Sequence, residues 1–244
     1  IGFTKEVSYT DFDSTYKKSY EKNPIQDINL SLTFLTGYRG YKNFVDFIES
    51  SSYFYFYYKS VEFKYCYCEI ESLSKSELTF GTLQSNLLIK RLSYWYKDVV
   101  KEICDESNVD LKSYPYKYPY KYRDSMSGEI QLTNNGYSRA PLRIIIKGAF
   151  ENPEVNVYKE GKKVSTMRIL YKTDDGMLLL NSFPTDQRIE IRDKGEKIDA
   201  YKFQDFGVEN FIFLERGSHI LEIKANVSKP PTCTVVMTEG YLSN

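Results

Sequence analysis

Residues 114–122 read Tyr-Pro-Tyr-Lys-Tyr-Pro-Tyr-Lys-Tyr, and this run constrains the fold more than any other segment. Each proline fixes its own φ angle and biases the residue before it towards extended backbone, which disfavours a helix. The tyrosine rings can still lie along a surface while their hydroxyls stay in water. Because the run lies near the middle of 244 residues, it predicts an extended strap between two domains, residues 1–122 and residues 123–244.

Composition and charge exclude several classes of protein. Hydrophobic residues make up 41% of the chain and charged residues 27%, which is typical of a soluble globular protein. The longest aromatic-aliphatic run, Tyr53–Tyr58, is far shorter than the roughly 20 apolar residues that span a bilayer. The formal net charge is zero. The sequence therefore predicts neither a membrane partner nor a basic body that holds nucleic acid through its phosphates.

The first half is rich in tyrosine and phenylalanine, and its patterns predict strands around one helix. Residues 28–34 alternate apolar and polar side chains, the period of a half-buried strand. Apolar residues then recur at helical spacing from Tyr38 to Ile48. We expect further strands over Tyr53–Tyr58, Val61–Ile70 and Leu83–Leu92, and a helical turn over Val99–Cys104.

The second half carries many turn signals, which separate short runs with β character. The turn signals are Asn134-Asn135-Gly136, Glu160-Gly161, Asp174-Asp175-Gly176, Lys194-Gly195 and Arg216-Gly217. The predicted strands between them are Leu142–Ile146, Val155–Tyr158, Arg168–Lys172, Met177–Leu180, Arg188–Arg192, Asn210–Leu214, His219–Lys224 and Thr232–Thr238. Short strands at this spacing favour a β-sandwich. We also expect a hairpin at Asp175-Gly176, the dipeptide that type I′ turns prefer.

Residues that carry chemistry are scarce. The single histidine, His219, has no Cys, Asp or Glu at ligand spacing, so we interpret it as a polar surface residue. Cys66 and Cys68 lie on one face of a predicted strand, too far apart for an ordinary disulfide, and are interpreted as small apolar fillers. Glycine-rich phosphate loops and nucleophile elbows are missing. The sequence therefore predicts no catalytic residue, no bound cofactor and no metal site.

One strand has aromatic residues on both faces, and it is the candidate site. Tyr53, Tyr55 and Tyr57 project to one side, and Phe54, Phe56 and Tyr58 to the other. Both faces are then expected to be covered, one of them by the domain core. Three interpretations of the second face stay open: the flanking helix, a neighbouring subunit, or a carbohydrate platform.

The order of these segments resembles the distal tail proteins of long-tailed phages that infect Gram-positive bacteria. In the first half the resemblance rests on Ile28–Phe34, the helix with residues 41–48, residues 73–78, Gly81-Thr82-Leu83 and residues 93–96. In the second half it rests on residues 134–136, residues 144–148, Asn152-Pro153 and residues 210–217. The resemblance covers nearly the whole chain. It implies a mainly β protein with an N-terminal ring-forming β domain, one flanking helix and a C-terminal galectin-like β-sandwich.

The resemblance also implies partners and a location. A homohexameric ring at the tip of the tail would join the tail tube protein to a tail-associated hub or lysin protein, and carry receptor-binding or baseplate proteins around its rim. DNA would only pass through the central channel. The protein would be a virion component of the tail tip or baseplate, assembled in the cytoplasm of the bacterial host. Tyr53, Tyr55 and Tyr57 are the candidate subunit interface.

Two departures from relatives define the alternatives. The chain has no room for an inserted carbohydrate-binding module, and the sugar-contacting set of galectins is not evident in residues 123–244. We therefore expect the sandwich to be a docking platform. A carbohydrate-binding module that recognises a host surface polysaccharide is the alternative. A glycan-cleaving enzyme ranks third, because two carboxylates brought together by folding would suffice for it.

Overall fold

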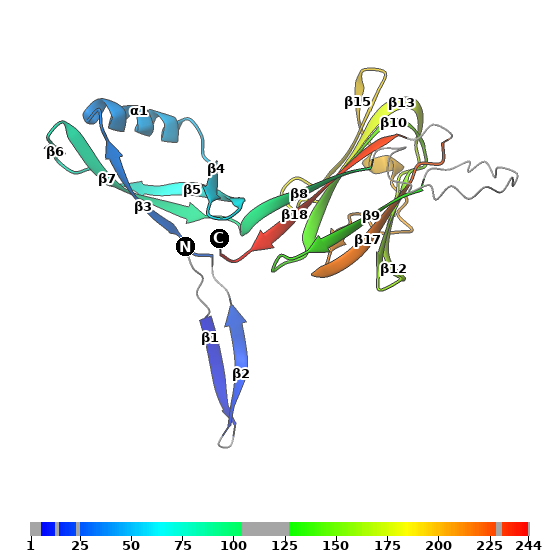
Figure 1. Ribbon diagram of the computed structural model, residues 1–244, viewed down its shortest axis with the longest axis horizontal. Helices are drawn as coiled ribbons and strands as arrows, with labels where there is room; N and C mark the ends of the chain where they lie inside the picture. The colour runs from blue at the N-terminus through cyan, green and yellow to red at the C-terminus, as the bar shows by residue number, and fades with distance from the viewer. Residues whose placement is uncertain (1–5, 13–14, 23–24, 104–126, 228–230, 244) are drawn as a thin grey trace, which may run out of the picture. The chain divides into compact units, whose positions relative to one another are not determined.

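The computed structural model describes residues 6–12, 15–22, 25–103, 127–227 and 231–243 (Figure 1). The chain forms two compact units: residues 1–97 with 240–244, and residues 98–239. The division falls between Lys97 and Asp98, before the predicted boundary at residues 122 and 123. The Tyr-Pro run at residues 114–122, which would be the strap, lies outside the described residues.

The first unit is antiparallel β structure with one α-helix. Its elements are β1 (Glu6–Phe12), β2 (Thr15–Lys22), β3 (Ile28–Phe34), α1 (Tyr38–Glu49), β4 (Phe54–Lys59), β5 (Phe63–Leu73), β6 (Leu78–Thr79), β7 (Thr82–Arg91) and the start of β8 (Trp95–Ile103). Strands β1 and β2 form a hairpin of their own. In the main sheet β7 lies between β3 and β5, while β4 pairs with β5 and β6 with β7. The predicted strand over Ile28–Phe34 is confirmed to the residue.

Helix α1 lies over one face of this sheet (Figure 1). Its apolar stripe includes Phe44, which packs on the core with Phe54 and Phe56 of β4. The buried core combines aliphatic side chains with Cys66, Cys68 and a fully buried Trp95. The two cysteines are free thiols, as their spacing predicts. The end of the chain returns here, because Tyr241 packs on this core and the Leu242 carbonyl accepts a 3.5 Å hydrogen bond from Arg91 Nη1.

The second unit is a β-sandwich. Its elements are β9 (Ser127–Asn134), β10 (Ala140–Glu151), β11 (Glu154–Lys159), β12 (Lys162–Arg168), β13 (Lys172–Asn181), β14 (Arg188–Asp193), β15 (Glu196–Asp199), the 3₁₀ turn η1 (Tyr201–Phe203), β16 (Phe213–Leu214), β17 (Gly217–Lys224) and β18 (Thr232–Tyr241). One sheet has the order β15-β14-β13-β10-β18, with β16 beside β10; the other has the order β12-β11-β17-β9. The predicted fold class, mainly β with one α-helix, is confirmed in the described residues.

The two sheets of the sandwich share one apolar core. Strand β10 contributes Leu142, Ile144 and Ile146, and the second sheet contributes Val157 and Leu221, all of them almost inaccessible to water. Burying each such side chain stabilises the fold by about 1.5–3 kcal/mol. The alternating pattern of the sequence is therefore the direct cause of the two-layer architecture.

The helical turn predicted over Val99–Cys104 is wrong within the described residues, because β8 continues as a strand to Ile103. Two adjacent valines, Val99 and Val100, favour a strand over a helix. Val99 packs on the sandwich core, and Asp98 accepts a 2.7 Å hydrogen bond from the hydroxyl of Thr238 on β18. Tertiary packing thus selects the extended form.

The hairpin predicted at Asp175-Gly176 is also wrong, because β13 runs through both residues. Gly176 lies opposite Gly148 of β10, just before a register shift. A Cβ atom on Gly176 would lie 2.8 Å from Thr173 Cγ2 and 3.1 Å from the Arg192 carbonyl oxygen. The glycine therefore serves close packing between strands instead of a turn.

Of the remaining predictions for the second half, two turns are confirmed and two strands differ from their predicted ranges. Glu160-Gly161 and Lys194-Gly195 are two-residue links with positive φ at both positions, as type I′ turns require. The strand predicted over Arg168–Lys172 is instead the end of β12, a short link and the start of β13, and only Phe213–Leu214 of the Asn210–Leu214 run is a strand. Strands β1, β2, β6, β8, β9 and β15 were not predicted, nor was β12 apart from Arg168. In the described residues no helix is both long and apolar enough to cross a membrane.

Candidate functional site

The β4–β5 hairpin gathers tyrosines on the face of the first-unit sheet opposite to Phe54 and Phe56. Register places Tyr55 opposite Tyr67 and Tyr57 opposite Tyr65. Tyr65 also pairs with Tyr96 of β8. We call this set the tyrosine face. Its members are Tyr53, Tyr55, Tyr57, Tyr65, Tyr67 and Tyr96.

The rings of the tyrosine face form a continuous series of contacts. Tyr53 stacks on Tyr67 with ring centroids 5.4 Å apart. Tyr55 lies 5.2 Å from Tyr67 and 6.0 Å from Tyr65. Tyr65 is in turn 5.6 Å from Tyr57 and 5.7 Å from Tyr96. Cross-strand aromatic pairs of this kind contribute about 0.2–1 kcal/mol each and hold the rings in place.

The predicted candidate residues are the most exposed part of this face. Tyr53, Tyr55 and Tyr57 are 54%, 59% and 64% exposed. On the opposite side of β4, Phe54 meets Phe47 of α1 at 5.4 Å. The helix therefore covers the phenylalanine side of the strand, and the structure shows the tyrosine side open. The sequence prediction missed Tyr65, Tyr67 and Tyr96, although the Tyr65-Cys66-Tyr67-Cys68 alternation carried the signal for the first two.

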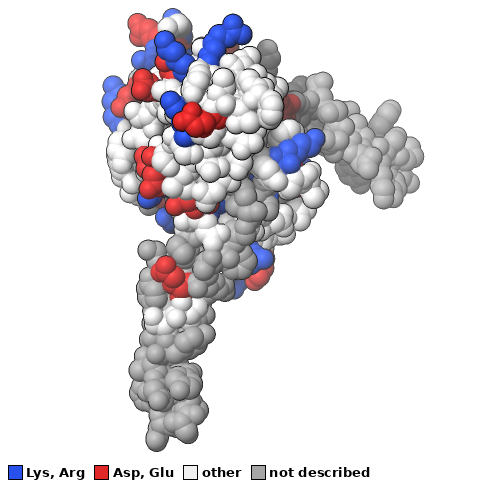
Figure 2. Space-filling view, turned by 90° about the vertical axis from the view of Figure 1, so that its left-hand side faces the viewer, with Lys and Arg blue, Asp and Glu red and all other residues white. Residues whose placement is uncertain are grey.

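A second apolar surface lies at the turns that join β3 to α1 and β6 to β7. We call it the apolar tip. Phe80 is 102% exposed and Leu35 79%, and Tyr38 and Leu78 are about half exposed. Gly37 holds the two turns together, since a Cβ there would lie 2.8 Å from Leu78 Cδ1. Figure 2 views the molecule from the side of α1 and β6 and shows a broad uncharged expanse with charged side chains of both signs around it.

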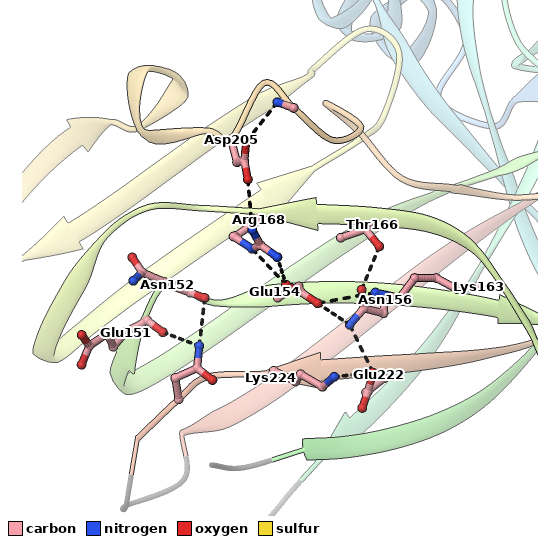
Figure 3. Close-up of polar contacts among 12 residues, drawn as sticks. Glu151, Asn152, Glu154, Asn156, Lys163, Thr166, Arg168, Asp205, Glu222 and Lys224 are labelled. Carbon is pink, nitrogen blue, oxygen red and sulfur yellow. Dashed lines mark hydrogen bonds and ion pairs between the residues drawn. The ribbon is translucent and has the colours of Figure 1, made fainter. Parts of the chain in front are cut away.

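The sandwich carries a polar network on the outer side of its β12-β11-β17 sheet (Figure 3). Arg168 donates two hydrogen bonds to Glu154, of 2.9 and 2.5 Å, and one of 3.2 Å to Asp205. Asn156 is fully buried and donates to Glu154 at 2.8 Å and to Glu222 at 3.1 Å. Each carboxylate is therefore matched by donors from neighbouring strands.

The remaining groups of the network complete this pairing. Thr166 donates a 2.8 Å hydrogen bond to Asn156 Oδ1, and the Tyr158 hydroxyl donates one of 2.9 Å to Glu222. Lys224 Nζ lies 3.2 Å from the same Glu222 carboxylate. The polar groups bind one another, so few donors are left for a sugar.

The network holds its carboxylates in the ionised form. Burial by itself would raise the pKa of Glu154 and of Glu222. Hydrogen bonds from Arg168 and Asn156 outweigh this for Glu154, and those from Tyr158, Lys224 and Asn156 do so for Glu222. The pKa of each group is therefore lowered. The bond to Glu222 in turn raises the pKa of the Tyr158 hydroxyl.

The prediction that His219 is a surface residue is wrong. It is 3% exposed, and its Nδ1 lies 3.1 Å from the Gly217 carbonyl oxygen. Its place in β17 turns it towards the sandwich interior together with Leu221, and burial lowers its pKa. It lines a cavity of about 590 Å³ at one end of the sandwich, beside Lys159 and Phe213, whose ring lies 4.4 Å from the Arg139 guanidinium carbon.

The side chains that the structure describes offer no metal centre. These residues contain no group of three or more His, Cys, Asp or Glu that could hold a metal ion. The first unit instead offers apolar and aromatic contact, and the sandwich offers a polar surface and more than one cavity, among them the one that His219 lines.

Comparison with known proteins bears on both units. Residues 1–92 match the family described as distal tail protein, N-terminal domain. No curated protein matches the sequence.

Solved structures of similar fold come from phage baseplates and from a phage adsorption apparatus. Two structures of the phage p2 baseplate in its activated conformation, with calcium and with strontium, give TM-scores of 0.65 and 0.64 at 14% identity, over 98% of this chain and 87% of the matched chain. The Dit protein of SPP1, described as a paradigm of the hub adsorption apparatus in phages that infect Gram-positive bacteria, gives 0.56 at 11% identity, over 98% and 89%. At these identities the likeness concerns the fold. The chain is thus Dit-like: its residues 1–92 match the distal tail protein N-terminal domain family, and its fold is similar to that of these phage proteins along 98% of its length.

Proposed function

We propose that this protein is a structural component of a phage tail tip or baseplate, and that its copies form a homohexameric ring. In this role the ring joins the tail tube protein to a tail-associated hub or lysin protein. Receptor-binding or baseplate proteins attach around it, and DNA passes through its central channel without being held. The protein is then part of the virion, assembled in the cytoplasm of the bacterial host.

The tyrosine face is the observation that carries this proposal. It lies within residues 1–97, the unit that also contains the matched distal tail domain. Monomeric proteins rarely expose a contiguous aromatic surface of this kind without a partner. Tyrosine is enriched at protein interfaces because its ring is apolar and its hydroxyl tolerates water. The first unit is therefore assigned ring formation, and the second unit points outward as a docking platform.

The polar network of the sandwich supports the second half of the proposal. A sugar-binding face needs donors and acceptors that are free to exchange water for hydroxyl groups. Here Glu154 and Glu222 are already bound by Arg168, Asn156 and Lys224. A polar surface whose carboxylates are already paired fits a protein partner better than it fits a glycan.

Electron microscopy of the purified protein and of particles that contain it tests the proposal. We expect sixfold rings, and on particles a ring at the end of the tail tube. The protein can also be labelled on intact particles. A label that is found only at the capsid or the tail shaft would contradict the proposal.

A carbohydrate-binding module is the second candidate, and the cavity that includes His219 is the observation that favours it. The cavity combines Arg139, Lys159 and Asn210 with Phe211 and Phe213, a mixture of polar groups and rings that suits a saccharide. Titration of the full chain with fragments of host surface polysaccharide separates the two. Saturable binding of the polysaccharide that is lost in Arg139→Ala would support a carbohydrate-binding module over a structural tail protein.

A further inference from the structure

The tyrosine face and the apolar tip lie at opposite ends of one sheet. Tyr65, at one end of β5, pairs with Tyr96, whereas Leu73, near the other end, pairs with Leu87 of β7. Strand β7 extends from Leu87 to its start at Thr82, where β6 pairs and Phe80 forms the turn. Figure 1 likewise draws β6 and β4 at opposite ends of the first unit.

The side chain of Phe80 does not contribute to the packing of its own chain. Its φ of 47° is in the left-handed region, where type I′ turns favour Asn, Asp or Gly and a bulky residue is strained. Its ring is fully exposed, so it adds nothing to the core. A phenylalanine that strains its turn and contacts water is best explained by a contact outside the chain.

We propose that the apolar tip of one copy packs onto the tyrosine face of the next copy. This inference rests on the proposed ring, because it names the two surfaces that the ring joins. The tip consists of side chains at two turns and the tyrosine face is a series of rings across neighbouring strands, so the two surfaces differ. Two different surfaces on one subunit are what a head-to-tail contact requires, and such contacts close into rings when the rotation allows.

The areas of the two surfaces agree with this pairing. Taking about 200 Å² for a fully exposed aromatic side chain, Tyr53, Tyr55 and Tyr57 present about 350 Å² together. On the same basis, with the two leucines counted alike, the four residues of the tip present about 550 Å². Full burial of both surfaces then removes about 900 Å² from water, somewhat more than half of the roughly 1,600 Å² of a standard interface, and leaves the remainder for a polar rim.

Two variants test the pairing without disturbing the core. Phe80→Asn removes the ring of the tip and places in the turn a residue that favours its backbone, so the monomer keeps or gains stability. Tyr55→Asp puts a charge at the centre of the tyrosine face, at a side chain that is 59% exposed. Each variant alone should weaken self-association at least tenfold, as sedimentation velocity measures. Thermal melting of each variant confirms that it is folded.

An equimolar mixture of the two variants tests whether the tip of one chain binds the tyrosine face of another. A Phe80→Asn copy keeps an intact tyrosine face and a Tyr55→Asp copy keeps an intact tip, so one contact can form between them and no chain can grow. We expect a complex of two chains in the mixture and monomers in each separate sample. If the mixture stays monomeric while the native protein assembles, the pairing is overturned and the ring proposal stands.

If the native protein stays monomeric in solution, disulfide trapping tests whether the apolar tip meets the tyrosine face. One variant carries Phe80→Cys and the other Tyr55→Cys, and both also carry Cys104→Ser. The two are mixed and oxidised with oxidised glutathione. The native Cys66, Cys68 and Cys233 are buried, so they do not compete for the new thiols. We expect the mixed disulfide to form at least tenfold faster than with Leu170→Cys, an exposed control position of the sandwich. Equal rates would overturn the inference, and together with an absence of rings they would also count against the proposed function.

Discussion

Single residues show where sequence patterns suffice and where they fail. The period of two in Tyr53–Tyr58 predicted which side chains share a face, because strand geometry fixes that alternation locally. Whether a face is open is decided by tertiary contacts, which the sequence does not display. His219 illustrates the same limit: its position in β17 turns it inward, and only the fold reveals this.

Asn156 is the residue on which the polar network depends. It is fully buried and donates to the carboxylates of both Glu154 and Glu222. Asn156→Ala removes this donor from both carboxylates and the acceptor of the Thr166 hydroxyl, so we expect the free energy of unfolding of the sandwich to fall by about 2 kcal/mol. Urea denaturation of the variant measures this. Asn210→Ala, at an exposed position, is the control and should change stability by less than about 0.5 kcal/mol.

The lowered pKa values of Glu154 and Glu222 make the stability of the sandwich depend on pH. Both groups have a folded pKa below the ordinary value of 4.5. Their stabilisation is therefore complete above that value and is lost as pH falls through the lower folded pKa. We expect the urea midpoint to be steady from pH 7 to about pH 5 and to fall below that pH. Glu222→Gln should show a shallower fall, and an equally steep one would contradict this account.

At the scale of elements, local signals predicted strands and true turns but misjudged two positions. Glu160-Gly161 became a turn because both residues can adopt positive φ. Asp175-Gly176 has the same chemistry and lies within a strand, because β10 and β14 on either side hold β13 extended. Val99-Val100 likewise follows its β propensity once the sandwich core is there to receive Val99. Neighbouring strands decided each case.

Gly176 tests the explanation for that strand. In Gly176→Ala the new methyl group would meet Thr173 and the Arg192 carbonyl oxygen. We expect a loss of about 1–3 kcal/mol in stability, in the range for overpacking a tight site. Asp175→Ala, on the exposed neighbour, should be nearly neutral. The reverse order of the two effects, measured by thermal or urea unfolding, would show that the residues do not pack as described.

At the scale of the whole molecule, order along the chain predicted the class of protein better than any single motif. The distal tail resemblance rested on weak segments in the right sequence, and the match of residues 1–92 confirms it for the first unit. The limits of the units could not be predicted. Residues 240–244 return to the first unit through Tyr241 and Leu242, a contact between distant parts of the chain that no local pattern encodes.

The mass of the assembled protein tests most directly whether the first unit forms the contact between the copies of the ring. Tyr57→Asp alters the tyrosine face, and Tyr201→Asp alters an exposed tyrosine of the sandwich. Sedimentation of both variants beside the native protein, under conditions in which the native protein forms rings, gives the answer. We predict that Tyr57→Asp abolishes the rings and Tyr201→Asp keeps them. Rings that survive Tyr57→Asp, or that are lost equally in both variants, would contradict the central claim.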